Sequence, residues 1–364
     1  MTETTNPILR DTLKKEYYKA LSRRLMLLVF CIVGILIFVG LFSLSVFDSI
    51  SLQDTYRIIW NHIIGNNDYE PRSIEWWADR YIWNRTIPHI LVAIIAGSSL
   101  AICGTLMQSL MSNPLADPYT TGISSGACFG AVMAIIAGVT FSSISGEMGI
   151  VTNAFIGAMV PALVIIAISA RIRMTPATII LVGTGISYFF NSMVTYMMIS
   201  TDADTLKTAY IWQIGSLDGM TWESVPVMFV ITLIGSILVL LSWRQLNLMS
   251  LGDESAVSLG LDVHKFRILC LILMSLMTAG VVSYVGIIGF VGLVAPHLVR
   301  MVIGGDNRYV IPLSMAAGTL LLLFADYVAM TLASLPVGVI MSLIGSPIFL
   351  LLILYNRKSK GVLY

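Results

Sequence analysis

The sequence predicts an all-α protein that crosses a membrane about ten times. Hydrophobic residues make up 57% of the 364 residues and charged residues only 11%, and the mean hydropathy is +0.87. A soluble domain carries about 25% charged residues, so this chain has too few charges to cover a water-facing surface. Apolar runs near the length of about 20 residues that a membrane span needs recur along the chain, and its basic residues concentrate on alternate loops.

The predicted spans follow from these apolar runs, each of which is bounded by polar residues, glycine or proline. We expect them at Leu25–Phe47, Ile87–Met111, Ile123–Val139, Val151–Ala170, Ala177–Ile199, Val225–Leu241, Ile268–Val285, Ile288–Ile303, Val310–Thr331 and Val337–Tyr355. The first run has no small-residue cleavage site after it, which favours a retained span over a signal peptide.

The orientation follows from the loops. With the N-terminus in the cytoplasm, only Arg57, Arg72, Arg80, Arg85 and Lys207 fall on the outer side, and the remaining 16 of the 21 Lys and Arg residues fall on the inner side. Cytoplasmic loops carry such an excess of Lys and Arg, so the chain is expected in the cell membrane with both termini cytoplasmic. Removing one predicted span would distribute the Lys and Arg residues over both sides of the membrane. The bias therefore supports a count of ten spans.

The predicted organisation is a single transmembrane domain, residues 25–356, between two cytoplasmic ends. Residues 1–24 read as a basic amphipathic N-terminus at the inner surface, and residues 357–364 as a short tail. Residues 48–86 form a long outer segment whose tryptophans are typical of the membrane–water interface. Residues 243–267 form the longest inner loop.

Several chemistries find no support in the sequence. It has no G-x-x-x-x-G-K-[ST] phosphate loop and no HExxH motif, and its four cysteines lie in apolar runs without metal-ligand spacing. We therefore expect no catalytic residue, no metal site and no cofactor bound by this chain. A net charge of +1 gives no reason to expect nucleic acid as a partner.

Asp326 is the clearest acidic residue within a predicted span. An ion-coupled secondary transporter would need such groups, because only function repays their desolvation. The alternative is that Asp326 bonds to Ser, Thr or backbone groups near the outer end of its helix. One acid is thin support for ion coupling, so the energy source is expected elsewhere.

The inner loop LNLMSLGDESAVSLGLDV (246–263) is too polar to span and predicts two short helices. Gly252 separates them, and the second runs from Glu254 to Leu259 and stops at Gly260, the small residue expected past a helix end. The pattern indicates a compact cytoplasmic knob that a soluble partner could grip. The alternative is an ordinary loop.

Together with the order of the spans, four stretches resemble the permease subunits of type II ABC importers for iron chelates and cobalamin. They are QSLMSNPLADPYTTGISSGACFGA (108–131), the inner loop (246–263), GIIGFVGLVAPHLVRMVIGGDNRYVIPLS (286–314) and LPVGVIMSLIGSPIFLLLI (335–353). The resemblance covers nearly everything from residue 86 onward.

The resemblance implies the type II ABC importer permease fold and a defined set of partners. These are a second permease subunit, two ABC ATPase subunits that carry ATP and Mg, an extracellular substrate-binding protein or lipoprotein, and the lipid bilayer. The implied cargo is an iron chelate, either a siderophore or haem, with a corrinoid such as cobalamin as the alternative and an oxyanion less favoured. The residues that it implies for coupling to the ATPase are Ser250, Gly252, Asp253, Glu254, Ala256, Leu259 and Gly260.

The breaker-rich turn NPLADP, at the inner end of the second span, is the first candidate gate. Its two prolines cannot continue a helix. The resemblance implies that Asn113 and Leu115 narrow the inner mouth of the pathway. It implies a second constriction at Thr175, Pro176 and Ala177. The alternative is a tight turn that serves packing alone.

The outer face departs from the family pattern. The two arginine positions at the start of the second span are Thr86 and His89 here, with Arg85 displaced by one, and Met330 stands where a further Arg is usual. We expect Arg80, Arg85 and His89 to serve in docking the binding protein instead.

Overall fold

The computed structural model describes residues 7–44, 50–141, 146–169, 171–172, 174–333 and 335–359. All regular structure in these residues is helical. The first half contains α1 (Pro7–Leu44), α2 (Leu52–Ile63), α3 (Ile74–Tyr81), the π-helical turn η1 (Ile82–Thr86), α4 (Ile87–Leu110), the 3-10 turn η2 (Pro118–Thr121), α5 (Ile123–Ala137), α6 (Glu147–Ser169) and α7 (Pro176–Ile199). The second half contains α8 (Ala203–Ile214), α9 (Val225–Leu241), α10 (Trp243–Met249), α11 (Asp253–Ser258), α12 (Val263–Val285), α13 (Val291–Ile303), α14 (Asn307–Ala333) and α15 (Val337–Ser359).

The described part of every predicted span falls mainly on a helix, with residues 45–47 and 170 outside the described residues, so the all-α, polytopic fold is confirmed. Six helical segments of the described chain are long and apolar enough to cross a membrane by themselves: Tyr18–Leu44, Ile74–Leu110, Glu147–Ser169, Pro176–Ile199, Val263–Val285 and Asn307–Leu332. The other four predicted spans are shorter or bent. The helices α5 and α13 and the apolar part of α15, Val337–Leu352, are shorter apolar helices, and α9 continues into α10 through a bend of 66°.

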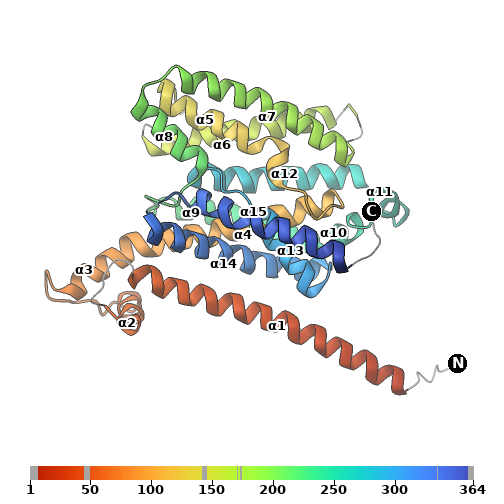
Figure 1. Cartoon of the computed structure of the whole chain (residues 1–364), viewed down its shortest axis with the longest axis horizontal. Helices are drawn as coiled ribbons and strands as arrows, with labels where there is room; N and C mark the ends of the chain where they lie inside the picture. The colour runs from red at the N-terminus through yellow and green to blue at the C-terminus, as the bar shows by residue number, and fades with distance from the viewer. Residues whose placement is uncertain are drawn as a thin grey trace.

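The helix α4 forms the centre of the bundle. Of its most apolar stretch, 89% is buried, and α9, α12, α13 and α14 surround it (Figure 1). Small residues make this close packing possible. A Cβ at Gly104 would lie 1.7 Å from the carbonyl oxygen of Gly292 on α13, so only glycine fits there.

A second layer lies on the opposite side of α12 (Figure 1) and consists of α5, α6, α7 and α8. The helices α5 and α6 form its closest pair. A Cβ at Gly126 of α5 would lie 2.3 Å from the carbonyl oxygen of Gly157 of α6. The exposed face of α7 carries large side chains, among them Leu181, Tyr188 and Tyr196, which are 72–74% exposed. This layer therefore leaves one long helix face uncovered by the chain itself.

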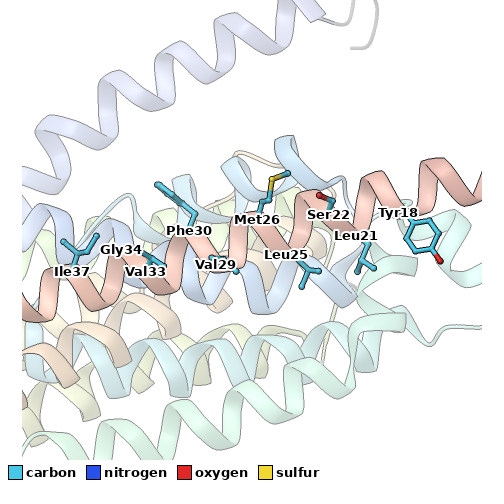
Figure 2. Close-up of a pocket in the computed structure, with 10 residues that line it drawn as sticks. All are labelled: Tyr18, Leu21, Ser22, Leu25, Met26, Val29, Phe30, Val33, Gly34 and Ile37. Atoms are coloured by element: carbon cyan, nitrogen blue, oxygen red, sulfur yellow. The ribbon is translucent and has the colours of Figure 1, made fainter. Parts of the chain in front are cut away.

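The helix α1 is a single continuous helix of 38 residues, so the basic N-terminal stretch and the first span are one element. One face packs on α14, where a Cβ at Gly34 would meet the side chain of Leu320 at 2.6 Å. The face drawn in Figure 2, from Tyr18 to Ile37, lines an open apolar groove of about 850 Å³. Only side chains of α1 line this groove, and they are mostly apolar, so this face is suited to contact with lipid.

The two ends of the bundle differ in character. The start of α1 and the end of α15 lie at the same end as α10 and α11, whereas α2, α3 and α8 lie at the opposite end (Figure 1). At that opposite end, His62 bonds to Asp79 at 2.7 Å and stacks on Trp83 at 4.0 Å. The long segment between the first two predicted spans is thus folded onto itself.

Candidate coupling and gating site

The inner loop folds as the sequence predicts, into two short helices joined by glycine. Helix α10 ends at Met249, and α11 begins after Gly252, whose φ of 92° is in the region that favours glycine. Gly260 follows α11 with a φ of 88°. No atom lies within 4 Å of a Cβ built at either position, so these glycines are needed for their backbone conformation rather than for close approach.

We call residues 250–260 the knob, and their exposed side chains form its outer surface. Leu251, Val257 and Leu259 are 59–61% exposed, and Glu254 lies exposed among them. Ala256 is fully buried and faces the bundle. The knob therefore has an exposed apolar surface that carries a carboxylate, and Ala256 packs against the bundle.

A polar cluster that the sequence did not predict fixes α10 in place. Asn247 donates from Nδ2 to Asp306 Oδ1 at 2.8 Å and accepts from the backbone N–H of Asn307 at 2.8 Å. Arg300 donates from Nη2 to Asn307 Oδ1 at 2.9 Å and to Ser109 Oγ at 3.0 Å. These bonds join α10 to the turn between α13 and α14 and to the end of α4.

The NPLADP turn closes the inner end of α4. Asn113 accepts a bond on Oδ1 from the N–H of Leu115 at 2.9 Å, and its own N–H donates to the carbonyl of Gln108 at 3.0 Å. Ser112 has a φ of 46° and donates from Oγ to the carbonyl of Met249 on α10 at 2.7 Å. The turn thus contacts the inner loop directly. Asn113 itself is exposed.

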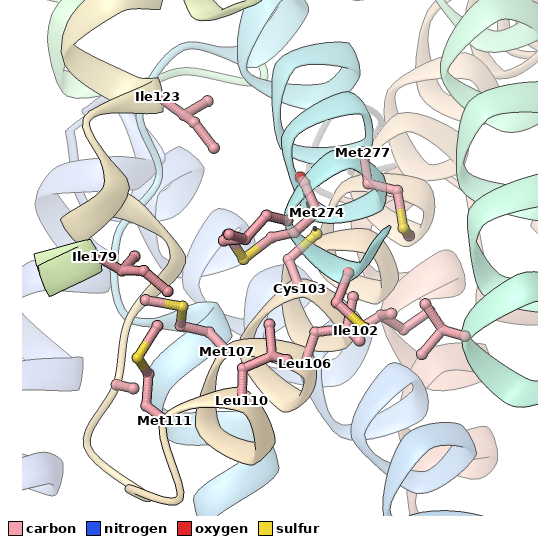
Figure 3. Close-up of a cluster of buried hydrophobic side chains, with 14 of the residues drawn as sticks. Ile102, Cys103, Leu106, Met107, Leu110, Met111, Ile123, Ile179, Met274 and Met277 are labelled. Carbon is pink, nitrogen blue, oxygen red and sulfur yellow. Dashed lines mark hydrogen bonds between the residues drawn. The ribbon is translucent and has the colours of Figure 1, made fainter. Parts of the chain in front are cut away.

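A buried cluster rich in methionine lies behind this turn. Figure 3 shows Met107 and Met111 of the α4 end beside Ile179 of α7 and Met274 of α12. All four are at most 6% exposed. Met is unbranched and fills irregular gaps, so the helices behind the turn pack through adaptable side chains.

Asp117 caps the short helix η2 by accepting a bond on Oδ1 from the N–H of Tyr119 at 2.8 Å. Burial raises the pKa of the Asp117 carboxyl, and that hydrogen bond opposes the rise only in part. The desolvation of the charged form therefore outweighs its one good bond.

The second candidate constriction is the start of α7. Thr175 is the N-cap, and its Oγ1 accepts from the N–H of Thr178 at 3.2 Å, with Pro176 in the first helical turn. Thr175 and Ala177 are exposed. A Cβ at Gly183 of α7 would lie 2.1 Å from the carbonyl oxygen of Thr120, so α7 packs on η2. The two candidate gate segments are therefore in contact, through η2 after the NPLADP turn and α7.

Arg267 connects these two gate segments to the knob. Its side chain is 4% exposed and donates from Nη2 to Asp253 Oδ1 at 2.5 Å. Nη1 donates to the carbonyl of Met174 at 2.7 Å, and Nη2 makes a longer contact of 3.5 Å with the carbonyl of Leu110. The sequence marked Arg267 only as an inner-side positive charge, because none of these three partners is close to it in the chain.

The outer end holds the three candidate docking residues in different settings. Arg80 is exposed and lies over the ring of Trp76 at 4.0 Å, and Arg85 is exposed as well. His89 is not a free surface group, because its Nε2 bonds to Asp326 Oδ2 at 2.6 Å. Asp326 is thus paired with a histidine, whereas the sequence reading expected Ser, Thr or backbone partners.

A cavity of about 370 Å³ adjoins this pair. Arg85, His89, Asp218 and Asp326 line it together with apolar side chains of α1, α14 and α15. Within the described residues, no group of three or more His, Cys, Asp or Glu side chains is arranged to hold a metal ion.

The fold defines the class of protein as a multi-pass, all-helical membrane protein. The chain belongs to the FecCD transport family, whose model matches residues 32–355. It is a permease subunit of an ABC transporter, in which ATP hydrolysis belongs to a separate subunit.

Two named relatives and one solved structure support this assignment. The chain is 36% identical to the hemin transport system permease protein HmuU of Yersinia pestis over 315 residues, covering 85% of this chain and 91% of that protein. It is 38% identical to the cobalamin import system permease protein BtuC of Halobacterium salinarum over 278 residues, covering 76% and 73%. An inward-facing ABC transporter described as of metal-chelate type superposes with a TM-score of 0.71 at 29% identity, covering 83% of this chain and 98% of that one.

Proposed function

We propose that this chain forms the membrane pathway of a type II ABC importer that carries an iron chelate, a siderophore or haem, into the cytoplasm. The observation that carries the proposal is the exposed knob at one end of the bundle, held by polar bonds to both candidate gate segments. A permease driven by a separate ATPase needs such a contact surface beside its gate. The relatives named for hemin and for iron chelatin transport support the cargo class.

The knob is the proposed seat of the ABC ATPase subunit, which binds ATP and Mg. Exposed Glu254, Leu259 and Gly260 would contact it, and the buried Ala256 would hold the knob in shape. Ser250, Gly252 and Asp253 set the geometry of the turn that precedes α11. Two ATPase subunits would serve two permease subunits, and the second permease subunit is either an identical chain or a relative.

The turn with Asn113 and Leu115 and the helix start with Thr175, Pro176 and Ala177 are the proposed inner gate. Their support is physical contact: η2 and α7 touch through Thr120 and Gly183, so they would move together. The exposed Asn113 and Ala177 face away from the core and are free to meet the second subunit.

At the outer end, the exposed Arg80 and Arg85 are the proposed contacts for a substrate-binding protein or lipoprotein. His89 would act there through the cavity that it shares with Arg85 rather than as an exposed charge. The positive-inside count supports a position of the knob and of both termini on the cytoplasmic side of the cell membrane.

Cobalamin is the second candidate cargo, and the identity to cobalamin permeases favours it specifically. The deciding experiment reconstitutes the chain with its ATPase and binding protein in proteoliposomes and measures uptake of ferric siderophores, haem and cobalamin with and without ATP. ATP-dependent uptake of an iron complex supports the proposal. Uptake of cobalamin alone assigns the alternative, and a lack of ATP-dependent uptake of all three contradicts both.

The variant Asp326→Asn separates the importer from an ion-coupled secondary transporter. We expect uptake to stay dependent on ATP, because the bond to His89 gives Asp326 a structural role. Loss of that charge-assisted bond should lower stability by about 1–3 kcal/mol, measured by thermal unfolding in detergent. The ATP-driven importer would be contradicted by two results together. Uptake would continue without the ATPase, and its dependence on protons or sodium would disappear in Asp326→Asn.

A further inference from the structure

Arg267 lies in the first turns of α12, at the inner end of the bundle, and its three partners belong to three different segments. Asp253 opens α11 in the knob, Leu110 ends α4 immediately before the NPLADP turn, and Met174 precedes the N-cap of α7. The planar guanidinium of Arg267 therefore contacts the knob and the backbone just before each candidate gate segment.

Both backbone partners are carbonyls that need an external donor. The carbonyl of Leu110 lies in the last turn of α4, where the helix itself supplies no N–H partner. The carbonyl of Met174 lies outside α7. A guanidinium has five N–H donors in a fixed plane and can serve several acceptors at once, whereas the ammonium group of lysine is a single compact charge.

We propose that Arg267 is the positioning residue that transmits movement of the knob to the inner gate, an inference that rests on the proposed function. The Arg267 side chain is only 4% exposed, so water does not readily replace a hydrogen bond that its guanidinium loses when it releases a partner. Asp253, Leu110 and Met174 therefore move as one unit with α12. A displacement of the knob by the ATPase is passed to the NPLADP turn and to the start of α7 as a rigid-body shift.

Among the residues that the structure describes, the other polar bonds of this end, including that from Ser112 Oγ to the carbonyl of Met249, reach the end of α4 and the NPLADP turn but not α7. The bonds of the second polar cluster join Asn247 to Asp306 and Asn307 and reach α4 through Arg300 and Ser109. They anchor α10 to the α13–α14 turn. The bond from Arg267 to Met174 is what ties the knob to α7.

The test places a bimane fluorophore on a single introduced cysteine in the assembled permease–ATPase complex in nanodiscs. Val257→Cys reports on the knob and Ala177→Cys on the gate, and both positions are exposed. The native cysteines, Cys31, Cys103, Cys128 and Cys270, are all buried. Emission is recorded on addition of Mg-ATP, first in the otherwise native chain and then with Arg267→Met.

With Arg267 present, we expect Mg-ATP to shift emission at both positions. With Arg267→Met, the response at Val257 should persist while the response at Ala177 falls by about tenfold, because the coupling between the two sites is lost. Arg267→Lys should restore part of it. If the Arg267→Met complex does not assemble, Asp253→Asn tests the same connection at a partly exposed residue. This variant should also weaken the response at Ala177.

Lys265→Met is the matched control. Lys265 lies two residues before Arg267 and forms an ion pair with Asp262 at 2.9 Å, but its side chain is 84% exposed. Both fluorophores should respond to Mg-ATP in this variant as in the native chain. An undiminished response at Ala177 in Arg267→Met or Asp253→Asn would overturn the role of Arg267. No response at Val257 even in the native chain would instead contradict the proposed ATPase seat.

Discussion

Glu254 is the charged residue of the knob that is free to meet a partner, since it is exposed in the first turn of α11. Its neighbour Asp253 is instead committed to Arg267. The two adjacent carboxylates therefore have separate tasks, one facing outward and one facing inward. In the proposed function, Glu254 would contact the ATPase and Asp253 would pass its movement to Arg267.

We expect Glu254→Lys to weaken association with the ATPase by about tenfold, because reversing a charge at an interface introduces repulsion where there was attraction. The measurement is co-purification and the ATPase activity that the permease stimulates. Thermal unfolding should stay unchanged, since no buried bond is lost. Glu223→Lys, an exposed residue of the loop before α9, is the control. Unchanged co-purification of Glu254→Lys would remove the knob from the interface.

At the scale of elements, the bundle depends on helices that approach to backbone contact. Gly104 of α4 and Gly292 of α13 show this most clearly, and the α5–α6 pair repeats it at Gly126 and Gly157. Helices in lipid gain no hydrophobic free energy from meeting each other, so close van der Waals packing between small residues must hold them. The position of α13 relative to α4 in turn sets the place of Arg300 beside Ser109.

Gly104→Ala should therefore destabilise the bundle far more than one methyl group suggests. The added Cβ would lie 1.7 Å from the carbonyl oxygen of Gly292, and α4 and α13 must separate to admit it. We expect a loss of about 1–3 kcal/mol or more, seen as a lower unfolding temperature or loss of monodisperse protein. Gly185→Ala, on the open face of α7, should be neutral. Equal effects of the two variants would contradict this packing.

The sequence predicted the elements well and the contacts between them poorly, for a physical reason. Apolar runs and basic loops report on single helices, and Gly252 and Gly260 mark the ends of α11 through local backbone requirements. The pairing of His89 with Asp326 spans 237 residues, and that of Arg267 with Leu110 spans 157. Local periodicity carries no signal for such partners, so His89 was expected at a docking surface and Arg267 was only counted as a charge.

At the scale of the whole molecule, α4 connects the two functional ends. Its first turn holds His89 beside the outer cavity, and its last turn supplies the carbonyl of Leu110 to Arg267. It is also the most buried of the spans. A shift of α12 or the knob would therefore act on the one helix that reaches both ends of the bundle.

The arrangement of the ends makes a direct prediction about topology. The knob, the start of α1 and the end of α15 lie at one end, and the α2–α3 segment lies at the other (Figure 1). In spheroplasts, a membrane-impermeant maleimide should label Asn66→Cys, between α2 and α3, but not Val257→Cys in the knob. Inverted vesicles should give the reverse pattern, because the positive-inside bias directs the knob to the cytoplasm.

The native chain is the control for this labelling, since its four cysteines are buried and should stay unlabelled until the protein is denatured. Labelling of both introduced cysteines from one side would mean that one of the two short or bent helices between them, α5 or α9, does not cross the membrane. The count of ten crossings would then fail, because an odd number of crossings between Asn66 and Val257 is what puts them on opposite sides.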